Sequence, residues 1–169
     1  MALIEPAYDG FEERYRVGAP QVVWTRLVAD LETPVSAMLK IAGDRPNSFL
    51  LESVEGGAVR GRYSMIGLAP DVLFRAFGNK AEINTTPEAY ADAFKPCAEP
   101  TLAALRRLIN EARVDLPEDL PAMSAGVFGY MSYDTVRLME DLGEPNYDPF
   151  GLPDAIFKNI DFSSGNFNS

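Results

Sequence analysis

SFLLESVEGGAVRGRYSMIG, the segment from Ser48 to Gly67, organises the rest of this chain. Two runs rich in aromatic and branched residues flank the pair Gly56-Gly57. Glycine adopts positive φ angles without steric cost, which is what a tight turn between two strands requires. The pattern therefore predicts a β-hairpin, and the hairpin is the best candidate for the core of the fold.

Four polar side chains, Glu52, Ser53, Arg60 and Arg62, interrupt the otherwise apolar strands of this hairpin. Buried polar groups need hydrogen-bonding partners. A two-residue turn would give a register with these pairs: Leu51 with Arg62, Glu52 with Gly61, Ser53 with Arg60, and Val54 with Val59. Strand alternation then places Ser53 beside both arginines and Glu52 on the opposite face. A hydroxyl beside two guanidinium groups can hold a small ligand with a carboxylate, although pairing with carboxylates of the same protein is the commoner role of an arginine in a strand.

Short turns separate the other elements that the sequence predicts. Strands are expected at 21–28, 72–77, 80–84 and 124–131, with another beginning at 155, and helices at 34–42, 101–113 and 133–139. Thr33 and Pro34 are a helix start signal, and the residues from Leu68 to Asp71 are expected to form a turn. The fold class is α+β, a mainly antiparallel β-sheet with helices packed on one face. Residues 1–20 are expected to be a loosely ordered lead-in, 21–160 one domain, and 161–169 a flexible tail.

Composition excludes several classes of function. The 15 Lys and Arg against 25 Asp and Glu give a net charge of −10, which disfavours a nucleic-acid partner. One cysteine and no histidine leave no metal site of the His/Cys type and no His-based catalytic triad. The acidic pairs near Asp134 and Glu140 match no known catalytic arrangement, so we assign no catalytic residue and no metal ligand. No signal peptide and no membrane span are recognisable, and we expect a cytoplasmic location without membrane contact.

Four stretches in the same order resemble one known family. They are Leu50-Leu51-Glu52-Ser53 with Gly61-Arg62-Tyr63-Ser64-Met65-Ile66-Gly67, then Thr33-Pro34-Val35-Ser36-Ala37, then Gly126-Val127-Phe128-Gly129-Tyr130 with Tyr133-Asp134, and finally Leu152-Pro153-Asp154-Ala155. Together they resemble the N-terminal region of anthranilate synthase component I, the large subunit of the enzyme that commits chorismate to tryptophan synthesis. The similarity runs from about residue 20 to 157.

The resemblance implies a regulatory role. Family members convert chorismate and ammonia into anthranilate and pyruvate with Mg²⁺, and a glutamine amidotransferase subunit supplies the ammonia. Their chorismate and metal residues lie in a C-terminal region without a counterpart here, so this chain is expected to hold no cofactor and to lack catalysis alone. The family's Leu-Leu-Glu-Ser stretch is implicated in tryptophan feedback binding, which maps onto Leu51, Glu52 and Ser53. Arg60 and Arg62 are further candidates, for the ligand carboxylate.

Two alternatives remain open from the sequence. The related aminodeoxychorismate synthase component shares this N-terminal architecture, and the residues that separate the two chemistries belong to the absent region. The chain could also be a stand-alone binding or scaffolding module that acts through the helix at 101–113.

Overall fold

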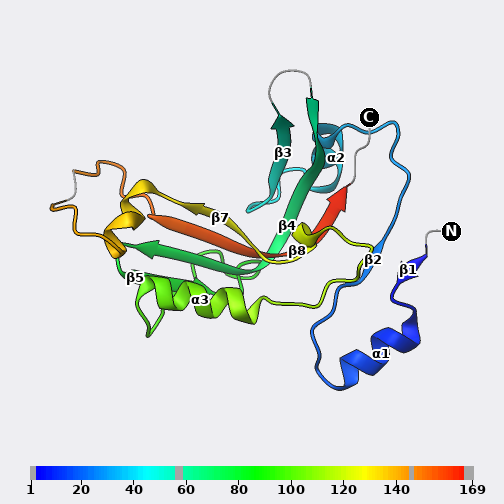
Figure 1. Ribbon diagram of the computed structural model, residues 1–169, viewed down its shortest axis with the longest axis horizontal. Helices are drawn as coiled ribbons and strands as arrows, with labels where there is room; N and C mark the ends of the chain where they lie inside the picture. The colour runs from blue at the N-terminus through cyan, green and yellow to red at the C-terminus, as the bar shows by residue number, and fades with distance from the viewer. Residues whose placement is uncertain (1–2, 56–58, 145–146, 166–169) are drawn as a thin grey trace. The chain divides into compact units, whose positions relative to one another are not determined.

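The computed structural model describes residues 3–55, 59–144 and 147–165, with backbone alone at 53–55, 59–62 and 160–165 (Figure 1). The chain divides into two compact units. Unit 1 comprises residues 1–68, 113–125 and 162–169, and unit 2 comprises residues 69–112 and 126–161. The domain boundaries predicted from the sequence stay a prediction.

Unit 1 begins with a helix that the sequence did not lead us to expect. Helix α1 (Tyr8–Arg16) lies between two short strands, β1 (Ile4–Glu5) and β2 (Trp24–Thr25), which pair antiparallel. Contacts at i, i+4 spacing support the helix: Phe11 stacks on Tyr15 with ring centroids 5.7 Å apart, and Glu12 pairs with Arg16. Because residues 1–20 are polar and include Gly10, the sequence did not predict this helix.

Helix α2 (Pro34–Ile41) confirms the predicted start signal. The Thr33 side chain accepts a hydrogen bond from the Ser36 backbone N–H at 3.1 Å, and the Ser36 side chain accepts one from the Thr33 N–H at 2.9 Å. This reciprocal arrangement is a capping box, and it satisfies two amides that the first turn of a helix leaves unpaired. Pro34 has no such amide to satisfy.

Strands β3 (Phe49–Glu55) and β4 (Val59–Phe77) form the predicted hairpin, but the predicted register is wrong. Glu55 pairs with Val59, so three residues connect the strands instead of two. The expected turn pair, Gly56-Gly57, lies outside the described residues. A second shift occurs at Ser53, because Val54 pairs with Arg60 whereas Glu52 pairs with Ser64. One residue of β3 therefore stands opposite three residues of β4.

Strand β4 also corrects the turn expected at residues 68–71. It pairs with β3 as far as Gly67 and with β5 (Lys80–Asn84) from Leu73 onward. Ala69 takes a φ of 45° and Pro70 has no N–H to place in a ladder, so the irregularity falls where the strand changes partner. The chain continues there as one strand, and the boundary between the units lies between Leu68 and Ala69.

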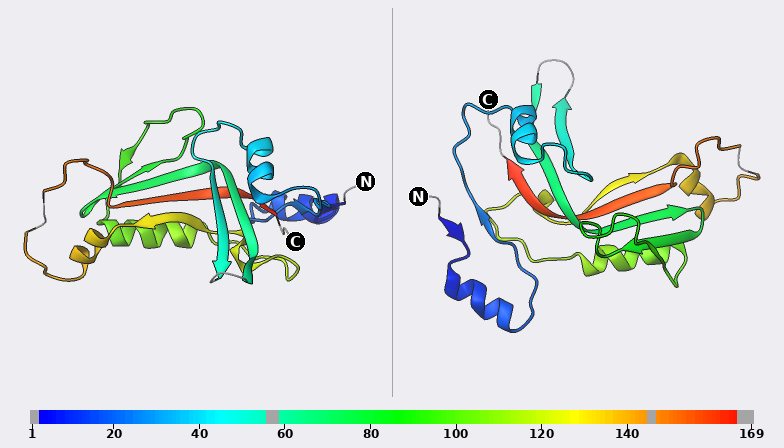
Figure 2. Two further views of the ribbon diagram at one scale, coloured as in Figure 1. Left: turned by 90° about the horizontal axis from the view of Figure 1, so that it is seen from above. Right: turned by 180° about the vertical axis from the view of Figure 1, so that it is seen from behind.

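The sheet of unit 2 has the strand order β6-β5-β4-β8-β7, with β6 at Lys95–Pro96, β7 at Val127–Met131 and β8 at Ala155–Gly165. Helix α3 (Thr101–Glu111) lies along one face of this sheet (Figure 2). The core forms where Ala104, Leu105 and Leu108 of α3 pack on the strands, with Phe74 at 1% exposure. The antiparallel pairings and the packed helix confirm the predicted α+β class.

Short segments complete the two units. Unit 1 contains the 3₁₀ helix η1 (Ala122–Ser124), and unit 2 contains the 3₁₀ helix η2 (Tyr133–Leu138) at the position where the sequence predicts a short helix. Strand β8 continues to Gly165, which lies inside the segment expected to be a flexible tail. The apolar stripe of α3 is buried against the sheet, so it offers little apolar surface for scaffolding.

Buried Asn84 at the end of β5 organises the loop that follows. Its side-chain amide donates to the backbone oxygens of Tyr90, at 2.7 Å, and Ala91, at 3.2 Å. Its side-chain oxygen accepts from the Thr86 N–H at 2.9 Å. Three backbone groups of an irregular segment are thus satisfied by one side chain that is itself fully enclosed.

Candidate functional site

The β3–β4 hairpin of unit 1 carries the residues predicted to bind a ligand. The Leu51 side chain is 48% exposed and Glu52 is also exposed. The side chains of Ser53, Arg60 and Arg62 lie outside the described part of the structure. Contact of these five residues with a ligand stays a prediction.

The register irregularity falls between Glu52 and Val54, inside the predicted site. Regular alternation would hold the side chains of Glu52 and Ser53 on opposite faces of the strand. A bulge breaks that alternation, bends the strand and re-aims a side chain, and bulges are over-represented next to functional sites. The extra residues of this irregularity belong to β4, between Arg60 and Ser64, and they stand opposite Ser53. A shared contact of Glu52 and Ser53 with one ligand stays a prediction.

Helix α2 packs against β3 within unit 1. Beyond the capping box, the Ser36 hydroxyl donates to the Glu32 carboxylate at 2.7 Å, and Lys40 forms an ion pair with the same carboxylate. These contacts with Lys40 and Ser36 lower the pKa of Glu32 below its ordinary value. The start of α2 is thus tied by four side chains: Glu32, Thr33, Ser36 and Lys40.

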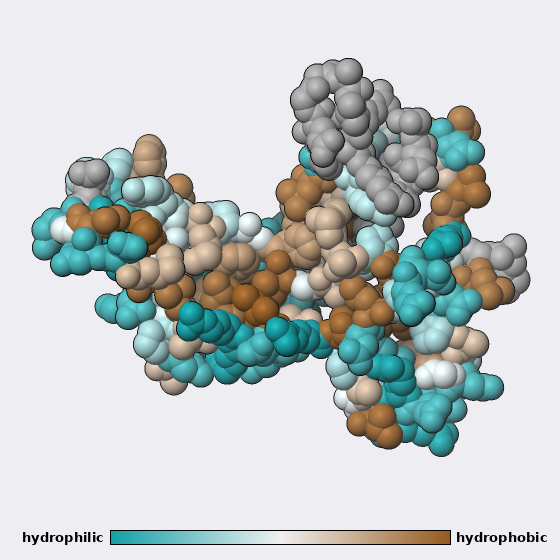
Figure 3. Space-filling model, in the orientation of Figure 1, coloured by the Kyte–Doolittle hydropathy of each residue, from teal (hydrophilic) through white to brown (hydrophobic). Residues whose placement is uncertain are grey.

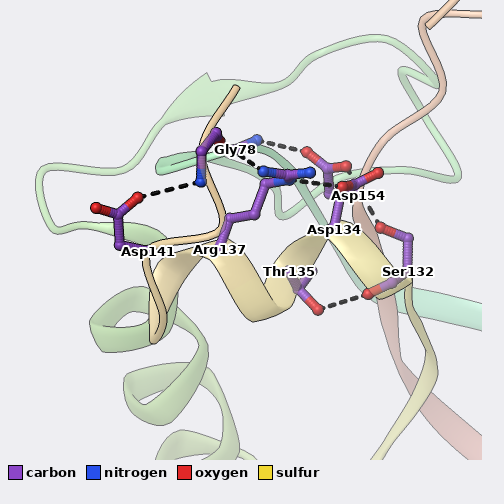
Figure 4. A network of polar contacts seen from close by, with 8 residues as sticks. Gly78, Ser132, Asp134, Thr135, Arg137, Asp141 and Asp154 are labelled. Atoms are coloured by element: carbon purple, nitrogen blue, oxygen red, sulfur yellow. Dashed lines mark hydrogen bonds and ion pairs between the residues drawn. The ribbon is translucent and has the colours of Figure 1, made fainter. Parts of the chain in front are cut away.

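A second polar cluster occupies unit 2 and centres on Asp154 (Figure 4). The Asp154 carboxylate accepts the Gly78 N–H at 2.6 Å and the Ser132 hydroxyl at 3.4 Å. Its backbone N–H donates to the Ala76 oxygen at 2.8 Å, and its backbone oxygen accepts from the Ser132 N–H at 2.7 Å. Gly78 takes a φ of 52° in the β4–β5 turn, a conformation that favours glycine. Asp154 therefore joins this turn to the end of β7.

Around this centre the other polar groups are also paired. Arg137 donates to the Asp134 carboxylate and to the Gly143 backbone oxygen, both at 2.7 Å. The Tyr130 hydroxyl donates to the Pro153 oxygen at 2.9 Å. A shallow polar hollow of about 420 Å³ lies along residues 137–143, formed by this single segment. The Asp154 cluster is therefore a structural joint between neighbouring segments. The side chains of Arg137 and Asp154 are both hydrogen-bonded within the fold.

Gly129 in β7 permits a close approach of two backbones. A Cβ atom at this position would lie 1.8 Å from the Ile156 carbonyl oxygen of β8. That separation is far below a van der Waals contact. The glycine is therefore required by the pairing of β7 with β8, where Gly129 stands opposite Phe157.

Burial changes the pKa of two side chains in unit 2, Cys97 and Lys158. Burial raises the pKa of the Cys97 thiol, against the opposing effect of Arg107, so the thiol form prevails at neutral pH. Burial lowers the pKa of Lys158 on β8.

The described residues contain no candidate metal site and no helix that could cross a membrane. Between residues 3 and 165, gaps excepted, no three side chains of His, Cys, Asp or Glu are grouped so that they could hold a metal ion. The helices of the described part are all too short or too polar to cross a bilayer.

Proteins of one name are similar in sequence to most of this chain. Its fold is of the α+β class, and no protein-family model matches it. It is 47% identical over 150 residues to anthranilate synthase component 1 of Cereibacter sphaeroides, a match that covers 89% of this chain and 30% of the relative. It is 36% identical over 162 residues to the protein of the same name from Synechocystis, covering 94% of this chain and 31% of the relative.

The sequence resemblance to anthranilate synthase component I is thereby confirmed, and the chain corresponds to a portion of that protein. It spans less than a third of the length of the relatives that it matches. The crystal structure of anthranilate synthase component I from Streptococcus pneumoniae aligns with a TM-score of 0.48 at 20% identity, over 80% of this chain and 27% of the other.

Sequence reasoning identified the motifs but missed the Asp154 cluster. Asp154 was quoted only as part of a family-like motif, and its role as a joint could not be read from its position in the chain. An aspartate immediately before a strand, with Pro153 ahead of it, was the available signal. The contact of Lys40 with Glu32, the residue before the cap, was missed for the same reason, since the two lie eight positions apart.

Proposed function

We propose that this chain is the N-terminal regulatory portion of anthranilate synthase component I, that it contributes to a tryptophan feedback site, and that it is not catalytic alone. The observation that carries the proposal is the 47% identity over 150 residues to a protein of that name. Support comes from unit 2, where the acidic residues Asp154 and Asp134 are paired within the fold, with Gly78 and Arg137.

The chemistry of tryptophan suits the hairpin. An indole needs an apolar wall, and the amino-acid end needs polar partners for its ammonium and carboxylate groups. Exposed Leu51 supplies apolar surface and exposed Glu52 a carboxylate for an N–H or ammonium donor. Ser53 provides a hydrogen bond to the amino-acid end, and Arg60 and Arg62 are candidates for the ligand carboxylate.

The proposed partners are a C-terminal chorismate-binding region, which would hold the Mg²⁺, and a glutamine amidotransferase subunit. Exposed apolar residues of unit 1 support a contact surface: Leu27 is 74%, Val28 89% and Leu31 97% exposed. Apolar residues are visible as brown patches on the surface in Figure 3. Large exposed apolar patches mark interaction sites, and these three apolar side chains lie close together in the chain.

Inhibition follows if tryptophan binds one arrangement of the enzyme better than another. A ligand shifts a conformational equilibrium only by its difference in affinity for the two states. The coupling is reciprocal, so the substrate should weaken tryptophan binding by the same factor. The proposal therefore links the affinity for tryptophan at the hairpin to the activity of a separate chorismate site.

The test uses an active enzyme in which this chain replaces the matched region of the Cereibacter sphaeroides relative. Anthranilate formation is measured against tryptophan concentration for the unaltered chimera, Ser53→Ala and the control Ser48→Ala. Ser48 is half-buried, and its hydroxyl donates to the Arg45 backbone oxygen at 2.8 Å. We expect Ser53→Ala to raise the half-inhibitory concentration about fivefold or more, the effect of losing one hydrogen bond to a ligand.

The role of Ser53 and the regulatory role of the chain can fail separately. Inhibition unchanged by Ser53→Ala rejects Ser53 as a contact. Absence of inhibition in an active, unaltered chimera rejects the regulatory role of the whole chain.

A further inference from the structure

We infer that the capped start of α2 is a positioning element for the effector site, so that Thr33 and its partners tune tryptophan affinity without touching the ligand. The inference rests on the proposed function and concerns what sets the affinity for tryptophan at that site. Its starting point is that α2 packs against β3, the strand that carries Leu51, Glu52 and Ser53.

Little else holds α2 in its helical form. It has eight residues and none of them is fully buried. Helices of this length are unstable in water on their own, because nucleation is costly and few backbone hydrogen bonds repay it. Stability must then come from packing on a neighbour and from the ends of the helix. In α2 the packing is partial, so the N-terminal cap has a large share of the effect.

The cap of α2 is unusually complete. Two reciprocal hydrogen bonds join Thr33 and Ser36, and the Ser36 hydroxyl reaches on to Glu32. The Glu32 carboxylate also pairs with Lys40 in the last turn of the same helix. The residue before the cap is thereby fastened to both ends of α2. By contrast, α1 and α3 have no side-chain hydrogen bond at their caps.

Loss of the cap should therefore loosen the surface on which β3 rests. The β3–β4 ladder is locally disrupted next to Glu52, where the register shifts, so the pairing with β4 restrains β3 less at this point. Contact with α2 is the additional restraint within unit 1. Fraying of α2 would let β3 sample other conformations, and tryptophan would have to select the competent one.

The test compares three variants in the active chimera. Thr33→Ala removes the cap hydroxyl, and Thr33→Ser keeps it. Ile83→Val is the control for general destabilisation, because it deletes one methylene from a partly buried side chain that packs against the core of unit 2. The half-inhibitory tryptophan concentration is measured together with kcat and KM for chorismate without tryptophan.

We expect Thr33→Ala to raise the half-inhibitory concentration about threefold to tenfold while kcat changes less than twofold, and Thr33→Ser to restore inhibition. An equal rise for Ile83→Val, or a failure of Thr33→Ser to restore inhibition, would overturn the inference and leave the tryptophan site standing. An unaltered chimera that ignores tryptophan overturns both proposals.

Discussion

The hairpin of unit 1 and the Asp154 cluster of unit 2 are both built from stretches that resemble the same family, yet they use their polar residues differently. In unit 2, Asp154, Ser132 and Arg137 are satisfied by neighbours of the same unit. In the hairpin, Leu51 and Glu52 are exposed beside a break in strand register. Of two motifs shared with one family, one is therefore paired within the fold, and the other presents exposed side chains at Leu51 and Glu52.

The largest effect expected from this comparison is at Gly129. Replacement by alanine places a Cβ 1.8 Å from the Ile156 oxygen, so β7 and β8 must separate. We expect Gly129→Ala to lower the free energy of unfolding by about 3 kcal/mol or more, a cost typical of severe overpacking. Urea unfolding followed by circular dichroism measures it. An unchanged midpoint would show that β7 and β8 can relax apart freely.

A smaller loss is expected at Asp154. Asp154→Ala leaves the Gly78 N–H and the Ser132 hydroxyl without their acceptor, which should cost about 2 kcal/mol in the same unfolding measurement. Asp115→Ala, at an exposed aspartate, is the matched control and should be nearly neutral. Equal midpoints for the two variants would deny Asp154 its role as a joint.

The smallest effect on stability is expected in the hairpin. Leu51→Ala and Glu52→Gln alter exposed side chains, and each should change the free energy of unfolding by less than about 0.5 kcal/mol. In the chimera the same variants should weaken tryptophan inhibition. A loss of stability comparable to that of Asp154→Ala would mean that the hairpin motif serves folding too, and the contrast between the regions would disappear.

Local signals were sufficient to predict much of the fold from the sequence. Thr33-Pro34 predicted the start of α2, apolar spacing predicted α3, and the Gly78-Asn79 turn separated β4 from β5. Each of these depends on residues that lie close together in the chain, where propensity and periodicity apply directly. The α+β class followed from the strands and short turns.

The errors arose where distant residues decide the outcome. The strand register depends on an irregularity at Ser53 that no local pattern encodes. Ala69 and Pro70 look like a turn, but β4 continues through them because it changes partners there. Asp154 contacts Gly78 across 76 positions, a relation invisible to any window of sequence. The family-like motif was the basis for predicting Leu51, Glu52 and Ser53 as site residues. Only the fold shows that helix α2 packs against the strand that carries them.

Each unit contains one natural reporter. The chain has one tryptophan and one cysteine, and Trp24 falls in unit 1 whereas Cys97 falls in unit 2. Indole fluorescence therefore follows the first unit. Alkylation of the partly buried thiol, slowed by its raised pKa, follows opening of the second. Whether the two melt together or one after the other can be decided in a single sample of the unaltered chain.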